Sequence, residues 1–333
     1  MAAAAAGGGT TGAATLRAAG PVCRLRSCSA EIAPGAARVD ASVAQGVSAA
    51  PDSAVAWEGG EQRLLRQAAA TAEKRGKWTL EAQGEATPYT TEYEALRPTY
   101  AHEAVAELVS RGMLAYVVTQ NADGLHHLSG IPYSKLSDVH GSAFTEYCSK
   151  CGERYVRETY VPEDRAEDFL AGRLPGPMPP HIKRCPGCGS NHWTGRSCEK
   201  CGGALRDTVV SFGDGLEECV LSPAFEAAEA ADACLSLGST MSIGPSNQVV
   251  IIQKGPLIVC VRQDTEMDRL CKRTGGVRAY GDCDAFMRRL MRALLGDADC
   301  DAWEDSLSRK AEIYDSKRPT SGKKRGDIFV KKF

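Results

Sequence analysis

Three C-x-x-C pairs constrain this chain more than any other feature: Cys148-x-x-Cys151, Cys185-x-x-Cys188 and Cys198-x-x-Cys201. The chain holds 14 cysteines in 333 residues. Its length and its lack of a secretory hydrophobic segment argue against a disulfide framework. Two thiolates held by one tight turn are typical of half a tetrahedral zinc site in a reducing compartment. The pairs therefore predict a small zinc-binding module.

Six cysteines exceed the needs of one zinc ion, and spacing alone does not choose four of them. The first and third pairs are each followed by a glycine, Gly152 and Gly202, and four thiolates would close a structural site that takes no part in chemistry. His181 and His192 flank the middle pair, so a second site is one alternative. The other is an inserted loop, because residues 174–180 are rich in proline and glycine.

Short apolar runs that end in polar residues predict a parallel sheet. The runs and their endings are Met113–Thr119 before Gln120, Asn121 and Asp123; Ala233–Leu237 before Gly238-Ser239-Thr240; and Leu257–Val261 before Arg262. Near-continuous apolar strands separated by helical segments are buried on both faces. In such sheets ligands bind at the carboxyl ends of the strands. The polar residues just named are expected at that edge.

Two helices are predicted with defined ends. Thr99 is a candidate N-cap for a helix that Gly112 closes, and Gly296 ends a second helix over Asp284–Leu295. We expect the second helix to bury one apolar stripe, formed by Phe286, Leu290, Met291 and Leu294.

The two ends of the chain differ in composition from the middle. Residues 1–60 are rich in Ala, Gly and Ser and are expected to be disordered, or else to form a transit peptide for a mitochondrion or plastid, because the first 30 contain arginine but no acid. We expect a folded domain over 61–298, a zinc module at about 145–206 and a basic tail over 299–333. We expect the tail to be solvated, with nuclear import or contact with chromatin or nucleic acid as the alternative. A net charge of -2 argues against attraction of the whole surface to nucleic acid or acidic lipid. The lack of a long apolar run predicts no membrane span.

The motifs resemble the central signature of the sirtuins. T-Q-N-A-D-G-L-H at 119–126 is followed by D-V-H-G at 138–141 and then by C-x-x-C, and the resemblance extends from Gly76 to Gly296. The segments 194–198 and 205–214 resemble the class IV branch, whose mammalian members are nuclear chromatin deacylases. This resemblance assigns the zinc ligands as Cys148, Cys151, Cys198 and Cys201.

The resemblance implies a Rossmann-like parallel sheet with a zinc ribbon. It also implies NAD-dependent deacylation of acetylated nuclear proteins, with release of nicotinamide and O-acyl-ADP-ribose. His140 would be the general base toward the nicotinamide ribose, a task that suits an imidazole. The residues implied to bind NAD are Trp78, Gln120, Asn121, Asp123, Gly238, Thr240 and Cys283. Phe212 and Gly213 would bind the acetylated peptide.

The chain departs from the sirtuin pattern upstream of Gly76. The family's G-A-G-x-S loop and P-D-F-R stretch are absent there, so the sheet is expected to lack its first strand, and Arg262 stands where the family usually has Asn. Either an exon has been replaced by unrelated sequence, or the protein is a degenerate member. A mono-ADP-ribosyltransferase and a catalytically impaired, zinc-stabilised binding protein are therefore the alternative functions.

Overall fold

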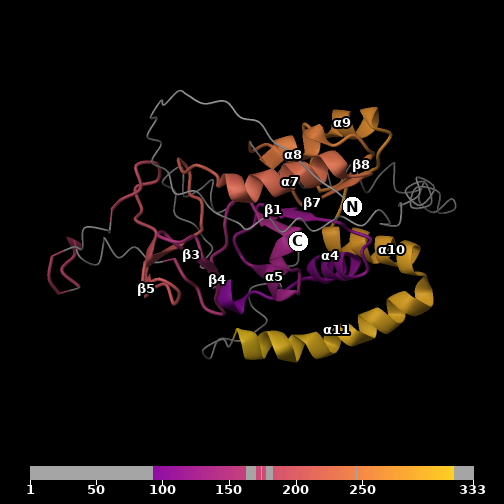
Figure 1. Ribbon diagram of the computed structural model, residues 1–333. Coiled ribbons are helices and arrows are strands. Elements are labelled where there is room, and N and C mark those ends of the chain that lie inside the picture. Colours follow the sequence, from indigo (N-terminus) through magenta and orange to yellow (C-terminus); the bar gives the residue numbers. More distant parts are fainter. Residues whose placement is uncertain (1–92, 163–169, 174, 178–182, 245, 319–333) are drawn as a thin grey trace, which may run out of the picture.

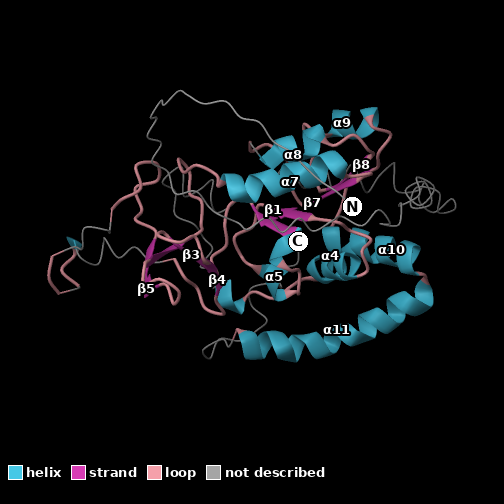
Figure 2. Cartoon of the chain, viewed as in Figure 1, coloured by secondary structure: helices cyan, strands magenta, loops and turns pink. Residues whose placement is uncertain are grey.

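The computed structural model describes residues 93–162, 170–173, 175–177, 183–244 and 246–318. The segment 1–60, Trp78, His181 and the tail beyond 318 lie outside the described residues. In Figure 1 a group of strands lies between two layers of helices, and a smaller module of strands extends to one side. Figure 2 shows the same division, with most of the helix in the larger part.

Parallel strands form the centre of the larger part, as predicted. β1 (Val117–Thr119) pairs with β2 (Leu136–Asp138), and β7 (Cys234–Leu237), β8 (Leu257–Cys260) and β9 (Arg278–Ala279) form a second group in that order. β1 begins later than the predicted run because the backbone N–H groups of Met113 and Leu114 close the preceding helix on the carbonyl of Leu108. The parallel α/β class is confirmed.

Helices cover both faces of these strands (Figure 1). One layer holds α4 (Tyr100–Ser110), α10 (Cys283–Leu295) and α11 (Asp297–Lys317); the other holds α7 (Glu218–Ala230), α8 (Ser246–Ile252) and α9 (Asp268–Arg273). α4 starts after Thr99 as predicted, and Gly112 follows its end with a φ of 71°. Short turns of helix occur at η2 (Tyr93–Ala95), α5 (Leu125–Leu128) and η3 (Tyr133–Lys135).

The predicted apolar stripe of the second helix needs one correction. Met287 is fully buried together with Leu290 and Met291, whereas Phe286 and Leu294 are only partly buried against the same core. α10 packs against α4 and α11 at the same time. Met287 faces both helices and therefore lies at the centre of the cluster they share.

The expected basic tail is in part a helix. The sequence predicts a tail from residue 299, whereas in the structure α11 continues to Lys317 and buries Trp303 and Tyr314. Tyr314 donates a hydrogen bond to the buried carboxylate of Glu103, which Lys310 also contacts at 2.7 Å. These widely spaced contacts hold a strongly charged segment on the core. None of the helices in the described ranges is long and apolar enough to cross a membrane.

The small module is an antiparallel sheet in the order β4-β3-β6-β5. Its strands are β3 (Thr145–Cys148), β4 (Arg154–Val156), β5 (Trp193–Ser197) and β6 (Ala204–Asp207). Glu146 is fully buried there and accepts hydrogen bonds from Arg157, Arg196 and Thr194. Three donors around one carboxylate replace the water that burial removes.

Candidate active site and metal centre

His140 lies at the carboxyl end of β2, beside the end of β1. The strands are in parallel register, with Thr119 opposite Asp138, and the N–H of Val139 donates to Thr119 at 3.0 Å. This pairing brings His140 next to Gln120, whose carbonyl oxygen lies 3.1 Å from Nδ1 of the imidazole. Two segments that are 20 residues apart thus meet at the predicted edge of the sheet.

The hydrogen bond fixes the form of the His140 ring. A carbonyl oxygen only accepts, so Nδ1 must carry the hydrogen and Nε2 is left with a lone pair in the neutral ring. Burial lowers the pKa of His140, and the bond to Gln120 offsets this in part. At neutral pH the imidazole is therefore a proton acceptor at Nε2.

Asp123 and Gly124 form the turn before α5. The Asp123 carboxylate accepts from the N–H of Leu125 at 2.9 Å, and burial raises the pKa of Asp123. The Arg318 guanidinium donates to the carbonyl oxygens of Asp123 at 3.1 Å and Gly124 at 3.3 Å. Arg318 was missed by sequence reasoning, because nothing local relates the end of α11 to this turn. Asn121, which precedes the turn, is exposed.

The ends of β7 and β8 lie on the same side of the molecule as the ends of β1 and β2. Gln120 contacts the sulfur of Met241 at 3.8 Å, which joins the two groups of strand ends. Gly238 adopts a φ of 68°, and a Cβ there would stand 3.5 Å from Sγ of Cys283. The structure therefore brings Gln120, Gly238 and Cys283 to one edge of the strands.

Thr240 and Arg262 have local partners. The Thr240 hydroxyl lies 3.0 Å from that of Ser242, and Arg262 forms an ion pair with Asp282 at 2.7 Å. The pair is about half exposed, so it contributes little stability. It does place a guanidinium at the end of β8, where the family resemblance leads us to expect Asn.

Phe212 and Gly213 follow a segment that is bound directly to the His140 turn. The N–H of Val210 donates to the carbonyl of His140 at 2.9 Å, and Phe212 is 57% exposed. Gly141 has a φ of 72°, and a Cβ there would overlap the carbonyl of Thr208. Only a glycine lets these two segments approach so closely.

Four cysteines from two turns gather in the small module. The sulfurs of Cys148 and Cys201 lie 3.5 Å apart and those of Cys151 and Cys198 lie 3.6 Å apart, and all four atoms lie within 4.8 Å of one another. A zinc ion with sulfur ligands at about 2.3 Å needs sulfurs roughly 3.8 Å apart in a tetrahedron. The geometry and chemistry of these residues fit a structural zinc ion.

The remaining histidines near the strand ends have structural contacts. Nε2 of His127 lies 2.8 Å from the Asp138 carboxylate, and the ring of His126 packs on that of His102 with centroids 4.8 Å apart. Both side chains therefore pair or pack with other side chains of the fold.

The model of the Sir2 family matches residues 61–245, more than half of the chain. NAD-dependent protein deacetylase SRT1 of Arabidopsis thaliana is 33% identical over 226 residues, which are 66% of this chain and 42% of the relative. NAD-dependent protein deacetylase sirtuin-7 of Homo sapiens is 31% identical over 252 residues, 70% of this chain and 54% of the relative. The chain thus spans about half the length of these curated relatives.

Among solved structures, one described as Sir2 bound to acetylated peptide is 22% identical, with a TM-score of 0.44. The matched region covers 65% of this chain and 77% of the chain in that structure. The sirtuin-7 relatives agree with the class IV resemblance of the sequence.

Proposed function

The chain belongs to the Sir2 family, and from this premise we propose that it is an NAD-dependent protein-lysine deacylase with His140 as its general base. The observation that carries the proposal is the hydrogen bond between Nδ1 of His140 and the carbonyl of Gln120. It holds a neutral imidazole at the carboxyl ends of two parallel strands, where a dinucleotide binds in such sheets. The alternatives are a mono-ADP-ribosyltransferase and an impaired binding protein.

The lone pair on Nε2 gives His140 its task. When bound, NAD supplies the ribose carbon that takes the acyl oxygen and the nicotinamide that leaves. His140 accepts a proton from a ribose hydroxyl, and the Gln120 carbonyl keeps the ring oriented and partly stabilises the imidazolium that results. A positioned base of this kind accelerates a reaction by about 10²- to 10⁴-fold.

The polar residues around His140 fit the nicotinamide and ribose end of the ligand. Gln120 and Asn121 supply amide groups and Asp123 supplies a carboxylate, all from the turn between β1 and α5. The absence of a side chain at Gly238 lets a ligand come close to the end of β7. We assign the adenosine side to Gly238, Thr240 and Cys283, and we include Trp78, outside the described residues, as a cofactor contact.

We propose that Phe212 and Gly213 bind the acetylated peptide as an added strand. The supporting facts are the exposure of Phe212 and the hydrogen bond from Val210 to the turn that carries His140. An extended peptide that pairs here would form main-chain hydrogen bonds and place its acyl-lysine near the imidazole. One zinc ion held by the tetrathiolate cluster would keep the neighbouring module folded.

Nuclear proteins, including those of chromatin, are the substrates we favour. The run Lys323-Lys324-Arg325 supports this, because short basic runs direct nuclear import and bind nucleic acid. A fluorescent fusion should enter the nucleus and lose this preference when the three residues are changed to alanine. Exclusion of the unchanged fusion from the nucleus would contradict the assignment.

Nicotinamide release from NAD and an acetylated peptide tests the enzymatic proposal. Release should require the acetyl group and fall at least about 10²-fold in His140→Ala, with an unfolding midpoint close to that of the wild type. Equal release by the variant would refute the role of His140. Covalent transfer of labelled ADP-ribose to protein would instead identify the transferase. Salt-sensitive binding to DNA without any thermal shift by NAD would identify the binding protein.

A further inference from the structure

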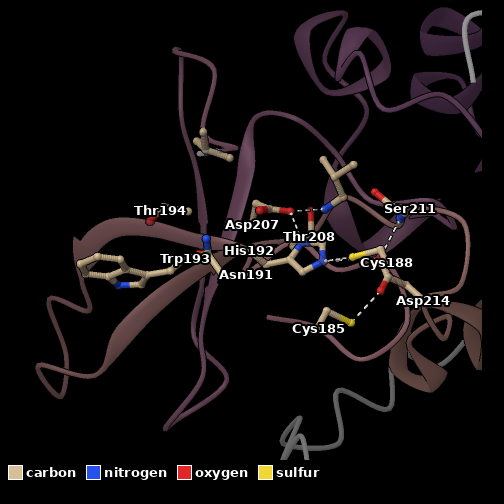
Figure 3. A network of polar contacts seen from close by, with 12 residues as sticks. Cys185, Cys188, Asn191, His192, Trp193, Thr194, Asp207, Thr208, Ser211 and Asp214 are labelled. Carbon is tan, nitrogen blue, oxygen red and sulfur yellow. Dashed lines mark hydrogen bonds and ion pairs between the residues drawn. The ribbon is translucent and has the colours of Figure 1, made fainter. Parts of the chain in front are cut away.

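We propose that Cys185, Cys188, His192 and Asp214 form a second zinc site, distinct from the tetrathiolate cluster. One ligand atom from each of these residues lies within 4.8 Å of the other three. Figure 3 shows the two cysteines, the imidazole and the Asp214 carboxylate converging from two separate loops. Of the two histidines that flank the middle C-x-x-C pair, His192 lies among the described residues and contributes its imidazole to the site.

The middle cysteine pair has the same backbone turn as the two pairs of the tetrathiolate cluster. In that cluster, the N–H of each first cysteine donates to the carbonyl five residues later, and the N–H of the following glycine donates back to the cysteine carbonyl at 2.8–2.9 Å. Cys185 repeats both bonds, with Ser190 and with Gly189 at 2.9 Å. Gly189 has a φ of 83°, close to the 74° of Gly152 and the 68° of Gly202. A loop that packs at random would not reproduce this turn.

His192 is oriented as a metal ligand. Its Nε2 lies 3.1 Å from Sγ of Cys188 and 3.4 Å from a carboxylate oxygen of Asp214. Its Nδ1 lies 3.0 Å from the buried carboxylate of Asp207, which also accepts from the N–H of Val209. Because Nδ1 donates its hydrogen bond to the Asp207 carboxylate, the lone pair of the neutral ring is on Nε2 and faces the cluster. This is the carboxylate–histidine–metal arrangement of many zinc sites.

The backbone at His192 supports a functional reason for this orientation. Its φ is 57°, in the left-handed region that only a few per cent of residues other than glycine adopt, histidine more often than most. Such strain persists where surrounding contacts impose it, and it concentrates at sites that hold ligands.

The distances fit a tetrahedral ion after a small adjustment. Zinc bonds of about 2.0–2.3 Å separate neighbouring ligand atoms by roughly 3.3–3.8 Å. The contact between Cys185 Sγ and Asp214 measures 2.9 Å, and the two contacts of His192 measure 3.1 and 3.4 Å. An outward shift of a few tenths of an ångström would admit the ion. Two sulfurs, one imidazole nitrogen and one carboxylate oxygen are all donors that zinc accepts.

Two glycines hold the cysteine loop against the loop of Asp214. A Cβ on Gly187 would overlap the carbonyl of Gly213, so the two backbones approach as closely as the chain permits. Asp214 is fixed within its own loop, because its carboxylate accepts from the N–H of Ser211 at 2.9 Å. The ligands are therefore positioned from both sides by backbone contacts.

A second ion would connect the cysteine loop to the turn we propose to bind peptide. Asp214 directly follows Phe212 and Gly213, and the same segment is bound to His140 through Val210. The ion would limit the motion of this turn and so favour peptide binding. This consequence rests on the proposed function, whereas the metal site itself does not.

Native mass spectrometry of the full chain, purified in the presence of zinc, tests the site without reference to activity. We expect two zinc ions per chain in the wild type and one in the variant Cys185→Ser/Cys188→Ser. The matched control Cys219→Ser removes a thiol outside both clusters and should keep two. One ion in the wild type, or two in the double variant, would overturn the proposal.

A milder variant covers the case in which the double substitution prevents folding. Asp214→Asn removes one charged ligand and leaves the two thiolates and the imidazole. The second ion should then be lost to a competing chelator at least about tenfold more readily, while the first is unaffected. Equal retention of both ions by wild type and Asp214→Asn would exclude Asp214 as a ligand. Zinc counts and nicotinamide release are independent readouts, so failure of one proposal is distinguishable from failure of the other.

Discussion

Acid should destabilise this fold through two buried imidazoles, and His126→Phe should remove much of that effect. His102 of α4 and His126 of α5 pack ring against ring. Burial lowers the pKa of both to about 4. Asp284 raises the pKa of His102, and Asp123 and Asp138 raise that of His126, but burial is the largest effect for each. Within the described part of the chain, Nδ1 of His126 is buried without a hydrogen-bond partner.

The sign and size follow from the two states of the chain. An imidazole has a pKa of 6.5 when unfolded and about 4 here, so between these values the unfolded chain binds more protons. The contribution of these imidazoles to the free energy of unfolding is therefore nearly constant well above pH 6.5 and becomes more unfavourable as the pH drops toward 4. Each unit of pKa difference corresponds to about 1.4 kcal/mol, so one imidazole costs roughly 2 kcal/mol at pH 5 and about 3 kcal/mol at its limit.

Urea unfolding followed by tryptophan fluorescence measures this at pH 7.5 and pH 5. Other groups titrate in the same range, and comparison of wild type with His126→Phe cancels their contributions. The wild type should lose about 2 kcal/mol more than the variant, or roughly 0.7 M in the midpoint at a slope near 3 kcal/mol/M. Equal losses in the two proteins would show that His126 is not held neutral by burial.

Three substitutions test contacts elsewhere in the fold. Glu146→Ala leaves two arginines without their buried partner and should lower the free energy of unfolding by roughly 3 kcal/mol, measured in urea. Gly141→Ala places a Cβ on the carbonyl of Thr208 and should lower the melting temperature by at least about 5 °C. An unchanged midpoint would refute either argument. Arg318→Met removes the donors to the turn at Gly124; amide exchange there should rise while the zinc content stays constant, and unchanged exchange would show that the arginine does not order the turn.

Features with a local cause were predictable from the sequence. α4 has its cap residue and its closing glycine within one turn of each end, and the apolar run of β8 is mostly buried, as expected of a strand covered on both faces. The four cysteines of the tetrathiolate cluster could also be predicted from the sequence. Each C-x-x-C turn is built by backbone bonds that span only five residues, and the family resemblance chose between the pairs.

Features that depend on distant contacts were not predictable. The sequence of α11 predicts a charged tail because its many charged residues outnumber the few apolar ones. Among the apolar residues, Trp303 is buried only by contact with α4 and α10. Arg318 donates a hydrogen bond to the carbonyl of Asp123, 195 residues away in the sequence, and no local sequence pattern predicts such a contact. Asp214 is similar, since a single acid after Phe212 carries no signal of its own. The spacing of Cys188 and His192 did carry one, and Gly189 repeats the glycine that marks the other two pairs.

The strand order separates the edge that carries His140 from the ends of the second group of parallel strands. In a doubly wound sheet of order 3-2-1-4-5-6, strand 1 lies at the centre, and the glycine-rich turn that follows it binds the pyrophosphate. Here β2-β1 and β7-β8-β9 form two separate groups, and among the described residues β1 and β7 each pair on one edge only. Val117 and Leu235 nevertheless pack in the same hydrophobic cluster. The edge that carries His140 is therefore ordered by helices that span both groups, and if the chain binds NAD as we propose, we expect its affinity for the phosphates to depend on a central strand that these elements do not supply.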